Sequence, residues 1–307
     1  MDVAMAVTGV EYSKLIEGLP QLEKSGAAAV EVGWNLFEQD DATLCALGSR
    51  LARAGTPVRS VHAPFGDAGD LAALDPEERA KALASHEDLL RRAYLLGATL
   101  LIIHPGRMVD DESLIPQMER LVRDSVARLL PLAERQGVVL ALENMLPRHP
   151  ATATETLLAI VREADSPLLQ VCFDTGHAHV GDGVMPVFSV LAPHVVTIHL
   201  TDNDTWHDGH LQPPYGTIDW GAFIRALNAS GYRQPLTIET PPWGGASPRR
   251  MIEEVQALLN THGDGTGATL PRLATTGNEP MALLRCLRCG HFLIETEGGR
   301  TCSCNEV

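Results

Sequence analysis

Short runs of branched apolar residues alternate with longer segments of mixed polarity along the first 260 residues of the chain. Each apolar run has the length of a buried strand and is followed by glycine, proline or polar residues that end it. The predicted strands are Val3–Thr8, Ala28–Gly33, Val58–His62, Thr99–His104, Val138–Glu143, Leu169–Phe173, Val195–Leu200 and Leu236–Glu239.

The segments between these runs have the period of a helix. In Pro76–Leu96, Leu83, Leu90 and Ala93 lie on one stripe, whereas Glu77 and Asp88 fall elsewhere. The other predicted helices are Tyr12–Ser25, Asp41–Ala54, Leu114–Gln136, Thr152–Ala164, Val184–Leu191, Trp220–Ser230 and Pro248–Asn260. Several helices end in a glycine where a left-handed cap is expected, at Gly26, Gly55, Gly97, Gly137 and Gly231.

Eight consecutive strand–helix units of this size predict the α/β class and a closed (β/α)8 barrel, the TIM barrel, over residues 1–260. An open doubly wound sheet is the weaker alternative. The first strand–helix junction, Thr8-Gly9-Val10, carries neither a dinucleotide-binding nor a phosphate-loop glycine pattern.

The chain changes character after the last predicted helix. Residues 261–280 are rich in glycine, threonine and proline without apolar period, and predict a linker. Residues 281–307 hold four thiols, enough for one structural zinc in a small zinc-ribbon-like appendage, with Gly298-Gly299 as the reversal between the two pairs. The four zinc ligands expected there are Cys286, Cys289, Cys302 and Cys304. A redox pair or a disordered tail are the alternatives.

Composition and charge limit the kinds of molecule that the protein is expected to bind. The 307-residue chain has a net charge of −15, which disfavours non-specific attraction to nucleic acid or anionic lipid. Neither a signal peptide nor an apolar run of membrane-spanning length is apparent, so we expect a cytoplasmic protein with no membrane partner.

Histidines and carboxylates gather at the ends of the predicted strands. The active sites of such barrels form where the strands end, and six consecutive strands deliver a His, Asp or Glu there. Imidazole together with carboxylate suits Zn²⁺, Mn²⁺ or Fe²⁺. The sequence therefore predicts a divalent-metal site at this end of the barrel. The motifs are Ser60-Val61-His62, Ile103-His104-Pro105, Leu142-Glu143-Asn144, Asp174-Thr175-Gly176-His177, His199-Leu200-Thr201-Asp202, Asp208-Gly209-His210 and Ile238-Glu239.

Other side chains near the strand ends are candidates for the wall of a substrate pocket. They are Glu31, Trp34, Phe65, Trp206 and Trp243. A solvated carboxylate is the alternative for Glu31, and a cover over the barrel mouth is the alternative for the aromatic residues. Five further histidines lack strand-end context and are expected at the surface or behind the ligands: His86, His149, His179, His194 and His207.

The ordered set of strand-end motifs resembles the xylose isomerase-like barrel superfamily over residues 1 to about 260. That group includes sugar and sugar phosphate isomerases and epimerases, and metal-dependent apurinic-site endonucleases. The resemblance implies a single-metal site of the isomerases at Glu143, Asp174, His199 and Glu239. It also implies a second site at His62, His104 and Glu143, and a third at His177, Asp208 and His210, both known from the endonuclease branch.

Two enzymatic functions follow from this resemblance. The first is a metal-dependent isomerase or epimerase of a small carbohydrate, in which Glu143 and Glu239 transfer the proton of an enediolate intermediate and His177 binds a substrate oxygen. The second is a phosphodiester hydrolase that uses one to three metals, favoured by Asp208 and His210. Short loops after His62 and Glu143, and an acidic chain, argue against duplex DNA. The alternative functions are those of a lyase, an oxygenase or a non-enzymatic scaffold. A homodimer is the alternative to a monomer.

Overall fold

The computed structural model describes residues 1–240, 246–263, 294–296 and 299–301. The chain divides into two compact units, Met1–Thr266 and Gly267–Val307. The second unit contributes one antiparallel pair of strands, β9 (Ile294–Thr296) and β10 (Gly299–Thr301), and Gly299 pairs with Thr296. The rest of the fold belongs to the first unit.

The first unit is a closed barrel of parallel strands, as the sequence predicts. The strands follow one another in chain order, and β1 pairs with β8 through Met5 and Ile238 to close the sheet. They are β1 (Val3–Val7), β2 (Val30–Gly33), β3 (Val58–His62), β4 (Leu100–Ile103), β5 (Val139–Glu143), β6 (Leu169–Asp174), β7 (Val195–Leu200) and β8 (Leu236–Ile238).

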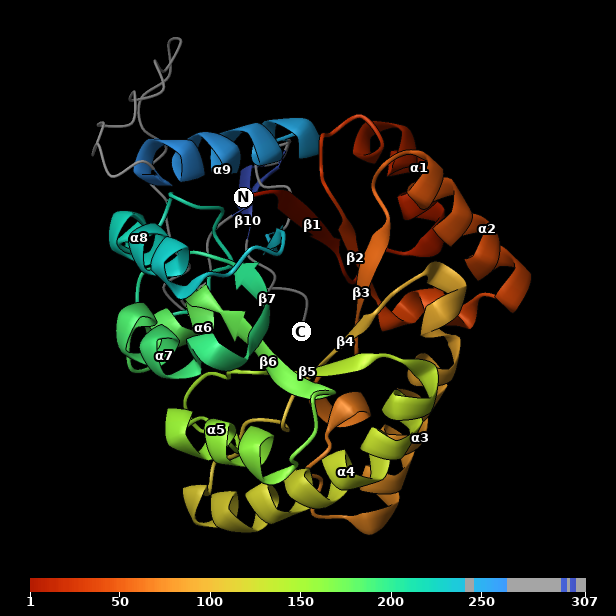
Figure 1. Ribbon diagram of the computed structural model, residues 1–307, viewed down its shortest axis with the longest axis vertical. Helices are drawn as coiled ribbons and strands as arrows, with labels where there is room; N and C mark the ends of the chain where they lie inside the picture. The colour runs from red at the N-terminus through yellow and green to blue at the C-terminus, as the bar shows by residue number, and fades with distance from the viewer. Residues whose placement is uncertain (241–245, 264–293, 297–298, 302–307) are drawn as a thin grey trace. The chain divides into compact units, whose positions relative to one another are not determined.

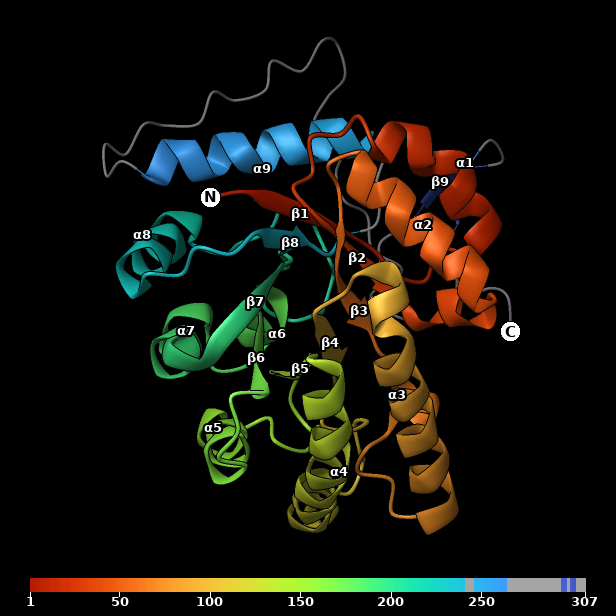
Figure 2. The ribbon, with the colours of Figure 1, turned by 45° about the vertical axis from the view of Figure 1, so that its right-hand side comes forward.

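Helices surround this barrel (Figures 1 and 2). They are α1 (Tyr12–Leu22), α2 (Asp41–Arg53), α3 (Pro76–Leu96), α4 (Ile115–Gln136), α5 (Thr154–Glu163), α6 (Thr175–Val180), α7 (Val184–Leu191), α8 (Trp220–Ser230) and α9 (Pro248–Gly263). Short 3-10 turns lie at Trp34–Glu38, Gly66–Gly69, Glu112–Leu114 and Ala192–His194. All five predicted cap glycines have positive φ, and Gly55, Gly97, Gly137 and Gly231 lie at the ends of their helices as predicted. Gly26 does not cap α1, because that helix ends at Leu22 with Glu23 as its C-cap.

Three helices differ from the predicted elements. Helix α1 ends at Leu22, with Pro20 in its last turn, and α9 continues three residues into the segment expected as linker. Helix α6 was not predicted. It begins directly after Asp174, whose side chain caps it by accepting a hydrogen bond of 2.6 Å from the backbone N–H of His177.

The barrel interior below the predicted site holds an apolar cluster as well as polar groups, such as Arg59, which donates to the hydroxyl of Thr197 at 3.1 Å. Ile102, Ala141 and Cys172 are fully buried and pack together, and Val196 packs against them. In the part of the chain that the structure describes, no helix has the length and apolarity needed to cross a membrane.

Candidate metal centre

The predicted histidines and carboxylates meet at the carboxyl-terminal mouth of the barrel. His62, Glu143 and Asp174 end strands β3, β5 and β6, and His199 is the last residue but one of β7. His104 and Glu239 come directly after β4 and β8. Since the strands are parallel, barrel closure brings these six positions to one place.

The first group, which we call the inner cluster, consists of Glu143, Asp174, His199 and Glu239. One donor atom from each lies within 4.8 Å of the donor atoms of the others. The Nδ1 atom of His199 is 3.3 Å from Oε1 of Glu143 and 3.0 Å from Oε2 of Glu239. These are the four residues that the resemblance implies for a single-metal site.

Two further histidines share Glu143 with the inner cluster. Nε2 of His104 is 3.1 Å from Oε2 of Glu143, and Nε2 of His62 is 4.0 Å from the same oxygen. His62 also lies 3.5 Å from Oε1 of Glu239. Glu143 therefore stands between two groups of donors, as a bridging carboxylate would.

The third group, the outer cluster, consists of His177, Asp208 and His210. Oδ2 of Asp208 is 3.4 Å from Nε2 of His177 and 3.0 Å from Nε2 of His210. Asp208 and His210 lie on the loop that follows β7, where the structure has an isolated bridge between Asp202 and Leu211. The structure thus brings together all nine residues predicted as metal ligands, in the three groups that the resemblance implies.

Backbone carbonyls fix which ring nitrogen each of three histidines presents. Nδ1 of His62, His177 and His210 lies 2.9 Å from the carbonyl oxygens of Ala63, Asn144 and Glu239 respectively. A carbonyl oxygen only accepts hydrogen bonds, so Nδ1 carries the hydrogen in each ring. In the neutral ring, which is the form that binds a metal, Nε2 is left with a lone pair that points into the clusters.

A second layer of polar groups holds Asp174 and His177 in place. The side chain of Asn144 donates to the carbonyl oxygen of Asp174 at 3.0 Å and accepts from its backbone N–H at 2.8 Å. The Thr201 hydroxyl donates to Asp174 at 3.3 Å and accepts from the N–H of Gly176 at 3.0 Å. The sequence analysis did not assign a role to Asn144 or Thr201, although each is close along the chain to a predicted ligand.

The carboxylates of the inner cluster depend on nearby positive charge. Burial alone raises the pKa of Glu143, but His199 and His104 together lower it well below its usual range. Burial also raises the pKa of Glu239, but the effect of His199 is larger and lowers this pKa to about 2. At Asp174 burial prevails over the opposing effect of His177 and raises the pKa to about 6.

The outer cluster shows the complementary effect on histidine. Burial favours the neutral ring of His210, but the Asp208 carboxylate outweighs it and raises the pKa to about 10. Burial disfavours the charged form of His177 too, yet Asp174 and Asp208 raise its pKa well above the usual range. Buried carboxylates are thus ionised only with a cation beside them.

These donors fit a divalent metal. Nitrogen and carboxylate oxygen atoms converge within bonding range of common points, in surroundings from which water is largely excluded. The fit is supported by Oδ1 of Asp208, which is buried without a hydrogen-bond partner. His62, His104, Glu143, Asp174 and His199 are all at most 8% exposed.

The family described as xylose isomerase-like TIM barrel matches residues 19–261. The chain belongs to this family.

The proteins similar to this chain include one named as an endonuclease and, by fold, one named as an epimerase-like protein. A protein named "Probable endonuclease 4" from Halorhodospira halophila is 28% identical over 233 residues, 68% of this chain and 75% of the relative. A solved D-tagatose 3-epimerase-like protein superposes with a TM-score of 0.75 at 21% identity, over 86% of this chain and 99% of its own. The TTHB071 protein of Thermus thermophilus, soaked with ZnCl2, has a TM-score of 0.66 at 28% identity, over 88% and 100%.

A cavity of about 800 Å³ opens above the clusters. Trp34 and Phe65 line it and pack edge to face, with ring centroids 5.3 Å apart. Trp206, by contrast, is 81% exposed and is not among the residues that line the cavity. Glu31 is neither a solvated carboxylate nor a wall of the cavity, because it is fully buried beneath the inner cluster. Apolar side chains of α1 and α9, including Leu15 and Met251, line the far side.

The remaining predicted site residues lie outside the described residues. These are Trp243 and the four cysteines of the tail, Cys286, Cys289, Cys302 and Cys304. Of the histidines without strand-end context, His86 is fully buried in α3, and the others are partly or fully exposed.

Proposed function

We propose that this protein is a divalent-metal-dependent isomerase or epimerase of a small carbohydrate. The observation that carries the proposal is the inner cluster itself, in which Glu143 and Glu239 come from non-adjacent strands and converge on one buried point beside His199. Solved sugar epimerases share the barrel, and the matching donor set in this chain supports the same class of chemistry.

Glu143, Asp174, His199 and Glu239 would hold the metal. A divalent ion bound there, Zn²⁺, Mn²⁺ or Fe²⁺, would supply Lewis-acid polarisation of a sugar carbonyl and the neighbouring hydroxyl, which would acidify the C–H bond of the hydroxyl-bearing carbon. The two glutamates then act as proton-transfer groups. The ionised carboxylate of one would accept the proton from the sugar carbon, and the other, protonated in the substrate complex, would return a proton to the opposite face. The two exchange protonation states with each turnover.

The surroundings of the two glutamates support the other steps of catalysis. His177 donates through Nδ1 to the carbonyl oxygen of Asn144, which turns its Nε2 toward the cavity side of the site, where it can bind a substrate oxygen. Trp34 and Phe65 offer apolar ring faces for the C–H surface of a sugar. The buried floor would keep water from the intermediate during a turnover. Glu143 and Glu239 line the cavity and would exchange their protons with solvent between turnovers.

The outer cluster supports a second candidate, a phosphodiester hydrolase with more than one metal. His177, Asp208 and His210 add a third set of donors, which a single-metal isomerase does not require. The acidic net charge of −15 and the short loops beside the mouth count against a duplex DNA substrate.

One experiment separates the two candidates. The metal-loaded protein is incubated in heavy water with a panel of ketoses, and in parallel with a DNA duplex that contains an abasic site. We expect deuterium to enter the carbon beside a ketose carbonyl, detected by NMR, and no strand cleavage. Strand cleavage without deuterium exchange would overturn the isomerase proposal in favour of the hydrolase.

A further inference from the structure

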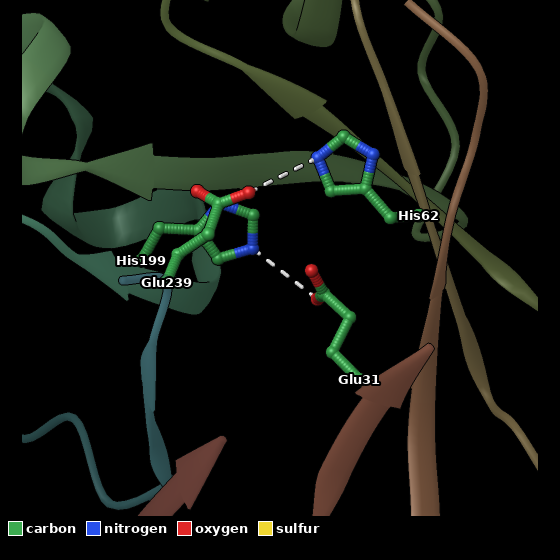
Figure 3. A group of neighbouring side chains, drawn as sticks. All are labelled: Glu31, His62, His199 and Glu239. Atoms are coloured by element: carbon green, nitrogen blue, oxygen red, sulfur yellow. Dashed lines mark hydrogen bonds and ion pairs between the residues drawn. The ribbon is translucent and has the colours of Figure 1, made fainter. Parts of the chain in front are cut away.

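A buried carboxylate of β2, Glu31, contacts the inner cluster from below (Figure 3). Glu31 is fully buried, and its Oε2 atom is 3.2 Å from Nε2 of His199. Figure 3 shows Glu31 and Glu239 approaching the His199 ring from different strands of the barrel. A carboxylate is costly to bury, so its place here calls for an explanation.

The two nitrogens of His199 face different partners. Nδ1 points to the inner cluster, at 3.0 Å from Oε2 of Glu239, whereas Nε2 points to Glu31. A neutral imidazole has one N–H and one lone pair. If the Nε2–H donates to Glu31, the lone pair lies on Nδ1, inside the inner cluster. This is the reverse of the tautomer that backbone carbonyls impose on His62, His177 and His210.

Glu31 is itself held in place by the neighbouring strand. The hydroxyl of Ser60 on β3 donates to Oε2 of Glu31 at 2.7 Å, and Ser60 is 1% exposed. The two residues are partners in the β2–β3 register because the pairing shifts by one residue between Val30 and Glu31. Such shifts often re-aim a side chain next to an active site. The strand register and the hydrogen bond from Ser60 therefore fix the position of the Glu31 carboxylate.

We propose that Glu31 is a positioning residue for the inner metal site, which fixes the tautomer of His199 and makes its Nδ1 a stronger donor. The inference rests on the proposed metal-dependent function. The chain Ser60–Glu31–His199 has the form of a carboxylate–histidine–metal relay, in which the outer carboxylate orients the ring and increases its basicity. Glu31 takes no part in proton transfer to the sugar.

The competing role for Glu31 is that of a direct ligand. One donor atom each of Glu31, His62, His199 and Glu239 lies within 4.8 Å of the others, and Oε1 of Glu31 is buried without a hydrogen-bond partner. The orientation of Nδ1 favours the positioning role, because the inner cluster already uses that nitrogen.

The test measures metal affinity and cobalt spectra of the full-length protein, so it does not depend on a sugar substrate. Zn²⁺ is titrated in competition with a chromophoric chelator, and Co²⁺ is bound to record its visible absorption. We expect Glu31→Ala to weaken the tightest site by about 10- to 100-fold. Glu31→Gln keeps an acceptor for the Nε2–H of His199, so it should weaken metal binding at this site less than Glu31→Ala does. Ser60→Ala should weaken metal binding less than either substitution of Glu31. The Co²⁺ bands should shift in Glu31→Ala while the number of bound ions at saturation stays that of the wild type.

The matched control is Asp70→Asn. Asp70 is also a buried carboxylate, 2% exposed, but it interacts with Arg107 and the N–H of Ala72 and not with the clusters. Its substitution should leave the affinity and the Co²⁺ spectrum unchanged. Circular dichroism of the metal-free variants verifies that each one folds.

Three outcomes would overturn the inference. Unchanged affinity in Glu31→Ala would remove the positioning role, and so would Glu31→Gln binding more weakly than Glu31→Ala. Loss of one ion at saturation would make Glu31 a ligand. Failure of the wild type itself to bind metal would instead overturn the proposed function.

Discussion

The inner and outer clusters use the same residue types but are held by different kinds of structure. Glu143, Asp174 and His199 lie on strands whose positions are set by barrel closure, and their side chains are at most 1% exposed. Asp208 and His210 lie on a loop, with side chains 20% and 32% exposed. Strand-borne donors are fixed by the fold itself, whereas loop-borne donors depend on local contacts that can change without loss of the barrel.

Those local contacts centre on Asp202. Its carboxylate accepts from Nε1 of Trp220 at 2.7 Å and from the N–H of Ile218 at 3.1 Å. Its backbone exchanges two hydrogen bonds with Leu211, of 2.7 and 2.8 Å. Asp202 thus closes the base of the loop, and the outer cluster depends on this closure. The proposed function assigns the chemistry to the inner cluster, so substitutions there should have larger effects on turnover than substitutions in the outer cluster.

The largest effect is expected at the inner cluster. Glu143→Gln removes a proton acceptor and a bridging charge, so turnover of the ketose should fall by about 10²- to 10⁴-fold. Deuterium exchange measured by NMR gives the rate. Turnover within about tenfold of the wild type would show that Glu143 is not a proton-transfer group.

A smaller effect on turnover is expected at the outer cluster. His210→Ala removes one donor of the outer cluster and should reduce isomerase turnover by less than about a hundredfold, since the proton-transfer groups remain. The same exchange assay measures turnover. If the protein is a hydrolase, this variant should lose activity as completely as Glu143→Gln does.

A substitution that disturbs packing at Asp202 tests whether this residue holds the loop that carries Asp208 and His210. A methyl group on Gly216 would collide with the carboxylate of Asp202 and would lie 2.5 Å from the carbonyl oxygen of Asn203. We expect Gly216→Ala to lower the free energy of unfolding by about 1–3 kcal/mol and to weaken the outer metal site. The matched control is Gly18→Ala in α1, where a methyl group meets nothing within 4 Å. Gly216→Ala without either effect would mean that the loop is not held at Asp202.

The last effect concerns a buried histidine outside the clusters and acts on stability, not on turnover. His86 lies in α3, with Nδ1 2.7 Å from the carbonyl oxygen of Ala82 and Nε2 without a hydrogen-bond partner. Burial lowers its pKa from 6.5 to about 4, the opposite direction to His177 and His210. Between these values the unfolded chain binds the extra proton, so stability is complete above pH 6.5 and decreases as the pH falls.

The loss of stability should not exceed about 1.4 kcal/mol per pH unit. Denaturant unfolding of the wild type and of His86→Leu between pH 7 and pH 4 measures it, and the contribution of the clusters cancels in the difference. A pH dependence that is the same in both proteins would contradict the assignment to His86.

Much of the fold and most of the site were predictable from the order of residues. The alternation of apolar runs with amphipathic segments predicted all eight barrel strands and the helices between them, with small shifts at their ends. A His, Asp or Glu at the end of six consecutive strands predicted which side chains meet at the mouth of the barrel, because parallel strands place these ends together whatever the loops do. Helix α6 escaped because its six residues are too short to show a period.

The sequence by itself determined the barrel, since a period of hydrophobicity is a local property that each segment carries on its own. It also determined which residue types stand at the mouth. Only the tertiary structure decided which ring nitrogen each histidine presents, that Glu31 lies beneath His199, and that Trp206 lies outside the cavity wall. Apart from His62, whose partner is the carbonyl of the next residue, these features depend on strand register and on groups distant in sequence, such as the Glu239 carbonyl beside His210, and no local pattern records such contacts.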